Sequence, residues 1–486
     1  MILAQLAQPS VDWHALAPEL ALTATACIVL VVDLFMPREA KWVAMPLSAA
    51  GILGTLAAVV SLIGDDRMTL GGTFEVNSFA LLFKGLFCVI GLIVLAISFN
   101  YFKSGRYQQG EYYFLMLCSL LGGLVMASAR DLVSIFIAIE LISIPAIVMT
   151  GMRKGDAKSN ESALKFFLFS VLSSAVMLYG MSLVYGATGE LQVDAIRNAM
   201  TQTDEPLIIL SVFFLIVGFA FKISAVPFHF WAPDTYEGAP SPVAAFLSTA
   251  SKIGGFVGLL ILMFRAFPQV SDTWRPAFAV LAVLTMTFGN LIALRQQHII
   301  RLLAYSGIAQ SGYVLVTLAL IKPGNPLAND QAFQSALIYL AIYALMDLGA
   351  FAAAIAFARK GGSYFISDYS GLWRRSPILA TLMAGFLLSL AGVPPMAGAW
   401  AKLFVFLAAV DRNVVLAVIM AVNAVIGAWY YLAVVKRMFL DAPEVEETIE
   451  VPYLLRVAMG VTALVLLAAF IYPRMITELA AESLFG

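Results

Sequence analysis

The stretch FKISAVPFHFWAPDTYEGAP, residues 221–240, interrupts a long apolar run, VFFLIVGFAF at 212–221. Lys222 follows this run directly, and Pro227 comes five residues later. A proline inside a helix has no N–H to donate, and its ring clashes with the carbonyl four residues before it, here that of Ile223. The stretch therefore predicts a broken helix with a lysine beside the break.

The composition of the whole chain is that of a membrane protein. Hydrophobic residues make up 61% of the 486 residues and charged residues only 12%, whereas a soluble domain carries about 25% charged residues. Apolar runs of about 20 residues recur, and each is long enough to cross a hydrocarbon core of about 30 Å. The strict alternation of a transmembrane barrel strand is missing. We therefore expect an all-α polytopic membrane protein.

The apolar runs predict fourteen transmembrane helices, of which the seventh and twelfth are long and contain prolines. The connections are too short to hold a soluble domain. The expected helices cover 17–36, 41–64, 77–101, 112–129, 131–152, 160–186, 206–236, 240–266, 276–295, 297–321, 332–359, 377–408, 412–440 and 452–473.

Lys and Arg are unevenly distributed over the alternating loops. One set of loops carries fourteen of them and the other set eight. Because cytoplasmic loops are enriched in basic residues, the first set is expected in the cytoplasm, with both termini on the opposite, periplasmic side. The N-terminus has no basic segment ahead of an apolar one, so we expect no cleaved signal peptide.

A second broken helix is predicted by a weak internal repeat. SAVPFHFW at 224–231 resembles AGVPPMAG at 391–398, so Pro227 aligns with Pro394, which Pro395 follows, at an offset of 394 − 227 = 167 residues. Five helices separate the two prolines, and an odd number places the second copy upside down in the membrane. Inverted repeats with one discontinuous helix in each half are a recurrent transporter design.

Several ionisable residues fall inside the expected helices. Each costs at least about 2.5–3.5 kcal/mol near the bilayer centre, so each needs a reason. Glu140 is either a proton site, the charge partner of a lysine, or a structural acid bonded to a neighbouring helix. Lys222, Lys252 and Lys402 lie in or beside the two broken helices, where freed backbone groups predict hydrated pockets. A snorkelling role is the alternative for Lys222, and Asp347 lies in mid-helix.

Other charged or titratable residues have simpler alternatives. Lys165 follows Glu161 by four residues, a spacing that favours a helical ion pair. Lys84 and Arg301 are expected to snorkel toward the interface. Two further sets complete the list. His229 and His298 are candidates for an intramembrane proton relay or for packing, and Asp234 and Glu237 are expected at the end of a loop.

The sequence offers no cofactor or metal motif. Its three cysteines, Cys27, Cys88 and Cys118, lie far apart inside apolar runs and show no CxxC spacing, so they are expected to be small core residues. No GxGxxG follows a strand. No basic block is present for nucleic acid. Redox chemistry is therefore expected in partner chains.

Three long motifs carry a resemblance to a known family. GFAFKISAVPFHFWAPDTYEGAPSPVAAFLSTASK at 218–252, RLLAYSGIAQSGY at 301–313 and GVPPMAGAWAK at 392–402 resemble the antiporter-like, proton-translocating subunits of respiratory complex I, and subunit N in particular. The resemblance covers essentially the whole chain. It implies two inverted five-helix repeats, at 111–268 and 269–440, after three N-terminal helices at 1–110 and before a last helix at 441–486.

The resemblance also implies a site and a mechanism. Glu140, Lys222, Lys252 and Lys402 match the family's mid-membrane proton-transfer residues, and Lys165 matches a lysine that the family pairs with the acid. At the position of Asp347 the family often has a neutral residue. Quinone reduction in partner subunits, which carry FMN and iron–sulfur clusters, would disturb the Glu140–lysine pair and send a proton toward Lys402. The implied location is the bacterial inner membrane, beside other membrane-arm subunits and lipid.

Two other functions remain open at this point. The chain could serve a multisubunit cation/proton antiporter, which would transport sodium without a redox partner. It could also be a structural membrane subunit whose charges only dock its neighbours, in which case Glu140 and Lys222 would tolerate neutral substitution.

Overall fold

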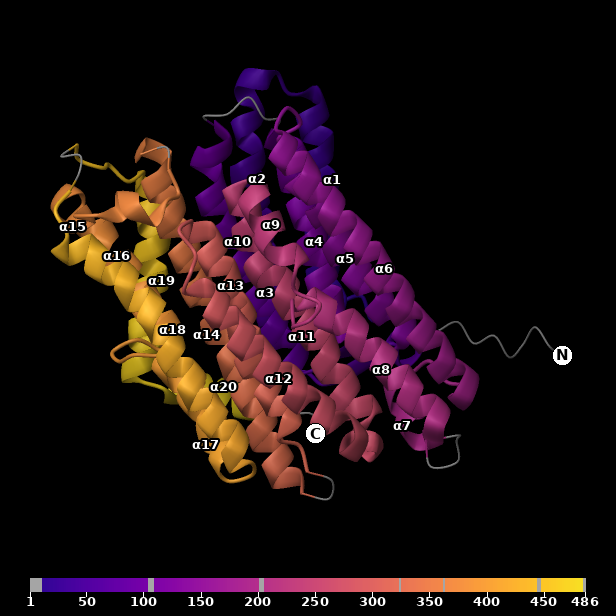
Figure 1. Ribbon diagram of the computed structural model, residues 1–486. Helices are drawn as coiled ribbons and strands as arrows, with labels where there is room; N and C mark the ends of the chain where they lie inside the picture. Colours follow the sequence, from indigo (N-terminus) through magenta and orange to yellow (C-terminus); the bar gives the residue numbers. More distant parts are fainter. Residues whose placement is uncertain are drawn as a thin grey trace.

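The computed structural model describes residues 11–103, 109–200, 205–322, 325–361, 363–443 and 447–483. The first ten residues, within the segment where no cleaved signal is expected, and Arg106, one of the counted basic loop residues, lie outside these ranges. The chain forms one bundle whose long helices run side by side (Figure 1). The paired strands of the described part are β1 (Arg67–Thr69) and β2 (Phe74–Val76), a short antiparallel hairpin.

Twelve helices of the described residues are long and apolar enough to cross a membrane, and three shorter apolar helices belong to the two broken segments. Counting each broken segment once, the predicted fourteen spans are confirmed. Eleven of the long spans are the single helices α1 (Ala17–Phe35), α2 (Ala44–Ser61), α3 (Ser78–Lys103), α4 (Gln109–Ser128), α5 (Leu132–Thr150), α6 (Ala157–Thr188), α12 (Ser271–Ala293), α13 (Ile299–Ala319), α14 (Pro326–Gly361), α18 (Val414–Leu440) and α19 (Tyr453–Ile471). The shorter helices of the broken segments are α8 (Glu205–Lys222), α16 (Pro377–Ala391) and α17 (Gly398–Val410).

The eighth span is assembled from four helical segments. It consists of α10 (Ser241–Phe246), the π-helix η5 (Leu247–Ser251), α11 (Lys252–Ile261) and the π-helix η6 (Leu262–Ala266). π-Helical turns are rare and often lie at functional sites. Short helices follow α6, precede α16 and follow α19; they are α7 (Val193–Ala199), α15 (Leu372–Arg375) and α20 (Arg474–Glu482).

Both predicted helix breaks are present. In the first, α8 ends at Lys222 and α9 (Trp231–Gly238) begins at Trp231, so the break covers residues 223–230. The freed backbone is bonded by side chains: the Ile223 carbonyl accepts from Ser311 at 2.9 Å, and the Val226 N–H donates to Thr285 at 3.0 Å. Irregular backbone at this depth is stable only where protein or water provides such partners.

The second break lies between α16 and α17. The α16 helix ends at Ala391, and Gly392 follows with a φ of 83°, a left-handed conformation that favours glycine. Pro394 and Pro395 lie within the break, and α17 begins at Gly398. The last turn of α16 therefore presents carbonyls that no helical N–H reaches.

The centre of the bundle is formed by three spans, namely Ser241–Ala266, α13 and α14, which are buried along nearly their whole length. The N-terminal helices α1–α3 lie toward one end of the bundle and α15–α18 toward the other, with α13 and α14 between them (Figure 1). In contrast, α6 and α19 expose apolar side chains on their outer faces, as lipid-facing helices do. The ionisable residues of the central spans are thus shielded from lipid.

Candidate functional site

Lys222 is the last residue of α8 and is buried, with 3% of its surface exposed. Its Nζ donates a hydrogen bond of 2.6 Å to Ser143, which lies one turn after Glu140 on α5. Glu140 is half-buried and accepts a hydrogen bond from Ser174 of α6. Glu140 and Lys222 are therefore neighbours across one turn of α5, but no direct ion pair joins them among the ion pairs of the described residues.

Lys165 has different partners from those implied by the resemblance. It forms the predicted ion pair with Glu161, at 2.7 Å, and a second pair with Asp234 at 3.0 Å. Arg301 binds Asp234 at 3.0 Å and Glu237 at 2.7 Å. The expectation of a loop for these two acids is wrong, since both lie in α9, and Arg301 is paired instead of snorkelling.

Lys252 begins α11 directly after the π-helix η5 and is buried. A Cβ added to Gly307 would lie 2.7 Å from its Nζ and 2.9 Å from the Tyr343 hydroxyl, so these groups surround one space. Asp347 is fully buried and accepts a hydrogen bond from Ser248, one turn before Lys252. Within the described residues, Lys252 Nζ and Asp347 Oδ1 have no hydrogen-bond partner. Buried polar atoms of this kind normally bond either protein or ordered water.

Lys402 is buried in α17 and is held by the second helix break. Its Nζ donates to the carbonyls of Leu390 and Ala391, at 2.9 and 2.8 Å, and lies 4.9 Å from the centre of the Tyr313 ring. These carbonyls are the ones that the end of α16 leaves without helical partners. Lys402 is therefore stabilised by backbone dipoles and an aromatic face, without a carboxylate among its described contacts.

One face of α13 joins the surroundings of Lys252 to those of Lys402. Gly307, Gln310 and Tyr313 lie three residues apart, a spacing that places them on the same side of the helix. Gln310 donates at 2.9 Å to the Leu390 carbonyl, which also binds Lys402, and it accepts from the hydroxyl of Tyr339 on α14. The polar groups around Lys402 thus reach Gln310 and Tyr339, and the same face of α13 carries Gly307 against Lys252.

A glycine lies against each of the three buried lysines. A Cβ on Gly255 would lie 2.9 Å from Lys222 Cγ, and a Cβ on Gly392 would lie 2.6 Å from Lys402 Cδ. Gly307 stands in the same relation to the Lys252 ammonium group. The backbone therefore approaches each lysine more closely than any larger residue would allow.

The two histidines differ in position. His229 lies within the first break and is half-buried, and its Nδ1 makes no hydrogen bond to a described residue. His298 caps the N-terminus of α13, where its ring packs 5.5 Å from Tyr364 and 5.9 Å from Phe365. His298 stands directly before the span Ile299–Ala319, and burial lowers its pKa below the usual value.

Lys84 also departs from its prediction. It is fully buried and does not snorkel, because its Nζ forms an ion pair of 2.8 Å with Glu19 of α1. The sequence interpretation also missed Ser143, Ser174, Tyr343 and Gln310. Gln310 could have been found, because it lies in the RLLAYSGIAQSGY motif, where its amide needs a hydrogen-bond partner inside the bundle.

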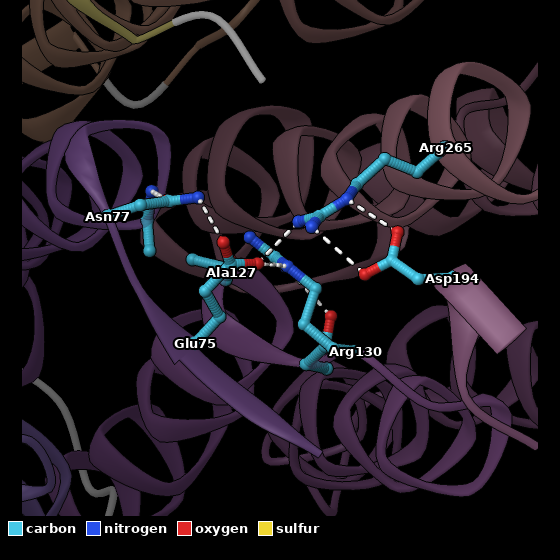
Figure 2. Close-up of polar contacts among 8 residues, drawn as sticks. Glu75, Asn77, Ala127, Arg130, Asp194 and Arg265 are labelled. Atoms are coloured by element: carbon cyan, nitrogen blue, oxygen red, sulfur yellow. Dashed lines mark hydrogen bonds and ion pairs between the residues drawn. The ribbon is translucent and has the colours of Figure 1, made fainter. Parts of the chain in front are cut away.

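A second charged cluster, here called the hairpin cluster, consists of Glu75, Arg130, Arg265 and Asp194 (Figure 2). Glu75 binds both arginines and accepts from Asn77, while Arg265 binds Asp194 at 3.0 Å. Although burial opposes it, the two guanidinium groups lower the pKa of Glu75, and burial lowers that of Arg130 to about 10. Glu75 and Arg130 are therefore charged at neutral pH, and the cluster ties the β1–β2 hairpin to α7 and η6.

Comparisons with known proteins agree with this geometry. A family model described as NADH:quinone oxidoreductase/Mrp antiporter, TM, matches residues 129–427. The NADH-quinone oxidoreductase subunit N of Moorella thermoacetica is 40% identical over 97% of this chain and 98% of its own length. The chain belongs to the subunit N family. A second subunit N, from Trichlorobacter lovleyi, is 36% identical over 99% of this chain and 98% of its own.

Solved structures lead to the same family and fold. A chain of respiratory complex I from Thermus thermophilus, solved with bound aureothin, superposes with a TM-score of 0.79 at 30% identity, covering 96% of this chain and 99% of that one. A chain of the Mrp complex from Dietzia superposes with a TM-score of 0.85 over 97% of this chain and 96% of that one, but at 19% identity, so it shows the fold alone.

The subunit N family assignment confirms three predictions from the sequence. These are the family, the all-α fold with two broken helices, and the function of a proton-translocating membrane subunit of NADH:quinone oxidoreductase. Subunit N is thus one part of an enzyme. In the described residues of this chain, no group of three or more His, Cys, Asp or Glu is placed to hold a metal ion.

Proposed function

We propose that protons cross this subunit along a buried axis formed by Glu140, Lys222, Lys252 and Lys402. The observation that carries the proposal is the row of three buried lysines, each set against a glycine, which runs from the first helix break to the second. An intramembrane lysine is costly unless it has a task. Two of the three stand beside freed backbone groups that can bind water.

Glu140 is the entry point for the driving signal. It lies in the middle of the α5 face on which Ile137 and Ile144 are exposed, by 55% and 56%. A half-buried acid on an otherwise apolar membrane face is stable when another protein covers it. We infer that another membrane-arm subunit, including antiporter-like ones, contacts this face, and that quinone reduction elsewhere in the complex acts on Glu140 through that contact.

The chain's own residues move the proton as follows. When the charge of Glu140 is displaced, Lys222 keeps only its bond to Ser143 and releases a proton toward Lys252. Asp347 stabilises the charged form of Lys252, and the Gln310–Tyr339 pair carries the proton on to Lys402. Moving one charge against 100 mV requires about 2.3 kcal/mol. Gain or loss of one charge-assisted hydrogen bond, about 1.5–3 kcal/mol, is of that size.

Several residues have supporting roles in this proposal. Lys165 is held by Glu161 and Asp234 near the first break and serves as a proton donor to the axis. His229 and His298 act as side entries, since each keeps one ring nitrogen without a bond to a described residue. Pro227, Pro394 and Pro395 maintain the breaks. The proposed units are 1–110, 111–268, 269–440 and 441–486, with the middle two as inverted repeats.

In this proposal, FMN, iron–sulfur clusters and quinone belong to partner subunits. The complex lies in the bacterial inner membrane, with both termini of this chain in the periplasm.

A cation/proton antiporter subunit is the competing function. Purification of the native chain separates the two, because FMN- and iron–sulfur-bearing subunits come with it only in the proposed function.

The axis is tested by Lys222→Ala in the assembled complex, with proton uptake and quinone reduction measured in sealed vesicles. We expect quinone reduction to continue or to slow, and the number of protons moved per quinol to fall. Lys436→Ala, at an exposed lysine of α18, is the matched control and should leave the number of protons moved per quinol unchanged. A normal number of protons per quinol together with normal assembly in Lys222→Ala would contradict the proposal.

A further inference from the structure

A buried acid–lysine pair lies outside the antiporter-like unit, in the N-terminal helices. Glu19, in the first turn of α1, and Lys84, in the second turn of α3, form an ion pair of 2.8 Å. The Lys84 side chain is fully buried and that of Glu19 is 9% exposed. Neither residue belongs to the 129–427 segment that matches the family model. The axis described above does not use this pair.

The pair is poorly satisfied for a structural contact. Apart from Glu19, the Lys84 ammonium meets only the ring of Phe74, 4.7 Å from its centre, and Glu19 Oε2 has no hydrogen-bond partner among the described residues. An ammonium has three protons to donate. A buried ion pair adds little stability unless its remaining protons and lone pairs are also bonded. In contrast, the Glu75 carboxylate in the hairpin cluster binds Arg130, Arg265 and Asn77.

On its inner side, the pair borders the span that carries Lys252. Phe87 lies one turn after Lys84, and a Cβ on Gly254 of α11 would lie 3.9 Å from the Phe87 ring. Gly254 is two residues after Lys252. The α3 helix also packs directly on α10 and η5. The α3 helix that carries Lys84 thus packs against the span that carries Lys252.

On its outer side, the pair borders the hairpin cluster. Phe74, which covers the Lys84 ammonium, precedes Glu75 in β2. From Glu75 the contacts continue through Arg265 to Asp194, whose side chain is 44% exposed (Figure 2). Arginine holds its proton at physiological pH, so only the carboxylates of the hairpin cluster can bind a proton.

We infer that Glu19 and Lys84 form a proton-binding site that connects the axis at Lys252 with the membrane face that bears Asp194. The inference rests on the proposed function. A proton that arrives from the axis binds the Glu19 carboxylate, and Lys84, which then lacks its counter-charge, releases a proton to the outer side. Transfer from Glu19 to Lys84 restores the original pair, so one proton enters and one leaves per cycle.

The test uses complex that carries Glu19→Gln, Lys84→Met or both changes, assayed for assembly, quinone reduction and protons moved per quinol. We expect the double variant to assemble and to reduce quinone, but with the same loss of proton yield as either single variant, because a relay interrupted twice is no worse than a relay interrupted once. Tyr112→Phe, which removes the 2.7 Å bond to Ser98 at the other end of α3, is the control and should pump normally.

A structural role gives the opposite pattern. Single variants would leave one buried charge unpaired and lose assembly, while the double variant would regain both assembly and full proton yield. That result overturns the inference even if the single variants cannot be isolated. The two proposals fail separately: full yield in the double variant together with a low yield in Lys222→Ala contradicts only this site, whereas full yield in Lys222→Ala contradicts the axis.

Discussion

Lys252 and Asp347 face one buried space from two central helices, the start of α11 and the middle of α14. Ser248 bonds Asp347, and Tyr343, one turn before Asp347, lies with the Lys252 ammonium around the position where Gly307 lacks a side chain. The two charges do not touch, because no ion pair within 4 Å joins these two described residues. This arrangement keeps an acid near a lysine without fixing the proton on either, and four predictions follow from it and its surroundings.

Asp347→Asn should lower the proton yield while the complex still assembles. Asparagine keeps an acceptor for Ser248 but removes the negative charge near Lys252, so the charged form of Lys252 loses its nearby counter-charge. Proton uptake per quinol in vesicles measures the effect. Asp330→Asn, at a half-buried acid in the first turns of the same helix, is the control. An unchanged yield in Asp347→Asn would exclude this acid from the route.

Gly392→Ala should displace Lys402 from its two carbonyls. Gly392 has a φ of 83°, and an added Cβ would lie 2.6 Å from Lys402 Cδ. The left-handed conformation alone costs a residue with a Cβ about 1–2 kcal/mol. We expect a lower proton yield and a lower melting temperature of the complex. At Gly385, on α16, a Cβ would meet only Met396 at 3.7 Å, so Gly385→Ala should change neither quantity.

Gln310→Leu should separate the two halves of the axis. Leucine fills a similar volume but cannot bind the Leu390 carbonyl or the Tyr339 hydroxyl, so the polar contacts of Gln310 beside Lys402 are lost. The expected result is normal quinone reduction with fewer protons moved. Thr317→Val, at a buried residue of α13 whose hydroxyl bonds only its own helix, serves as the control. Equal yields in both variants would show that protons do not pass Gln310.

Glu75→Gln should destabilise the hairpin cluster by about 3–5 kcal/mol, because the buried Arg130 and the half-buried Arg265 lose their shared carboxylate. The folded pKa of Glu75 is lowered, so its stabilisation is complete above the ordinary carboxyl value of 4.5 and is lost as the pH falls through the folded value. Melting curves of the complex should therefore differ between native protein and variant at neutral pH and converge in acid. Asp66→Asn, at an exposed residue, should melt like the native protein at every pH.

The sequence predicted the spans and both breaks because these depend on local features. A run of about 20 apolar residues is a helix in lipid, since its backbone has no other partner. Pro227 and Pro394 lie at breaks in such runs, whereas Pro145 lies inside α5 without ending it. Lys222, Lys252 and Lys402 could be found for a related reason: charges are rare in such runs, so each one is conspicuous.

What the sequence did not predict depends on contacts between distant segments. Lys84 looked able to snorkel because nothing near it in sequence indicates Glu19, 65 residues earlier, as its partner. Asp234 looked like a loop residue because the helix resumes after the break, at Trp231, and then brings the acid to Lys165. The serines that bind Glu140 and Lys222 could not be predicted either, because hydroxyl groups are common in apolar helices and few of them contact a charged group.

The carbonyls that hold Lys402 also affect how many protons the proposed axis holds at rest. Three buried amines line the proposed axis, but only two carboxylates, Glu140 and Asp347, stand beside it. An interior of low polarity favours zero net charge, so in the resting subunit two protons are shared among three amines. In the proposed axis the amine without a proton is Lys402, because backbone dipoles and the Tyr313 ring stabilise it but no carboxylate does. Each proton transfer along the axis then moves the unprotonated amine one position in the opposite direction, from Lys402 toward Lys222.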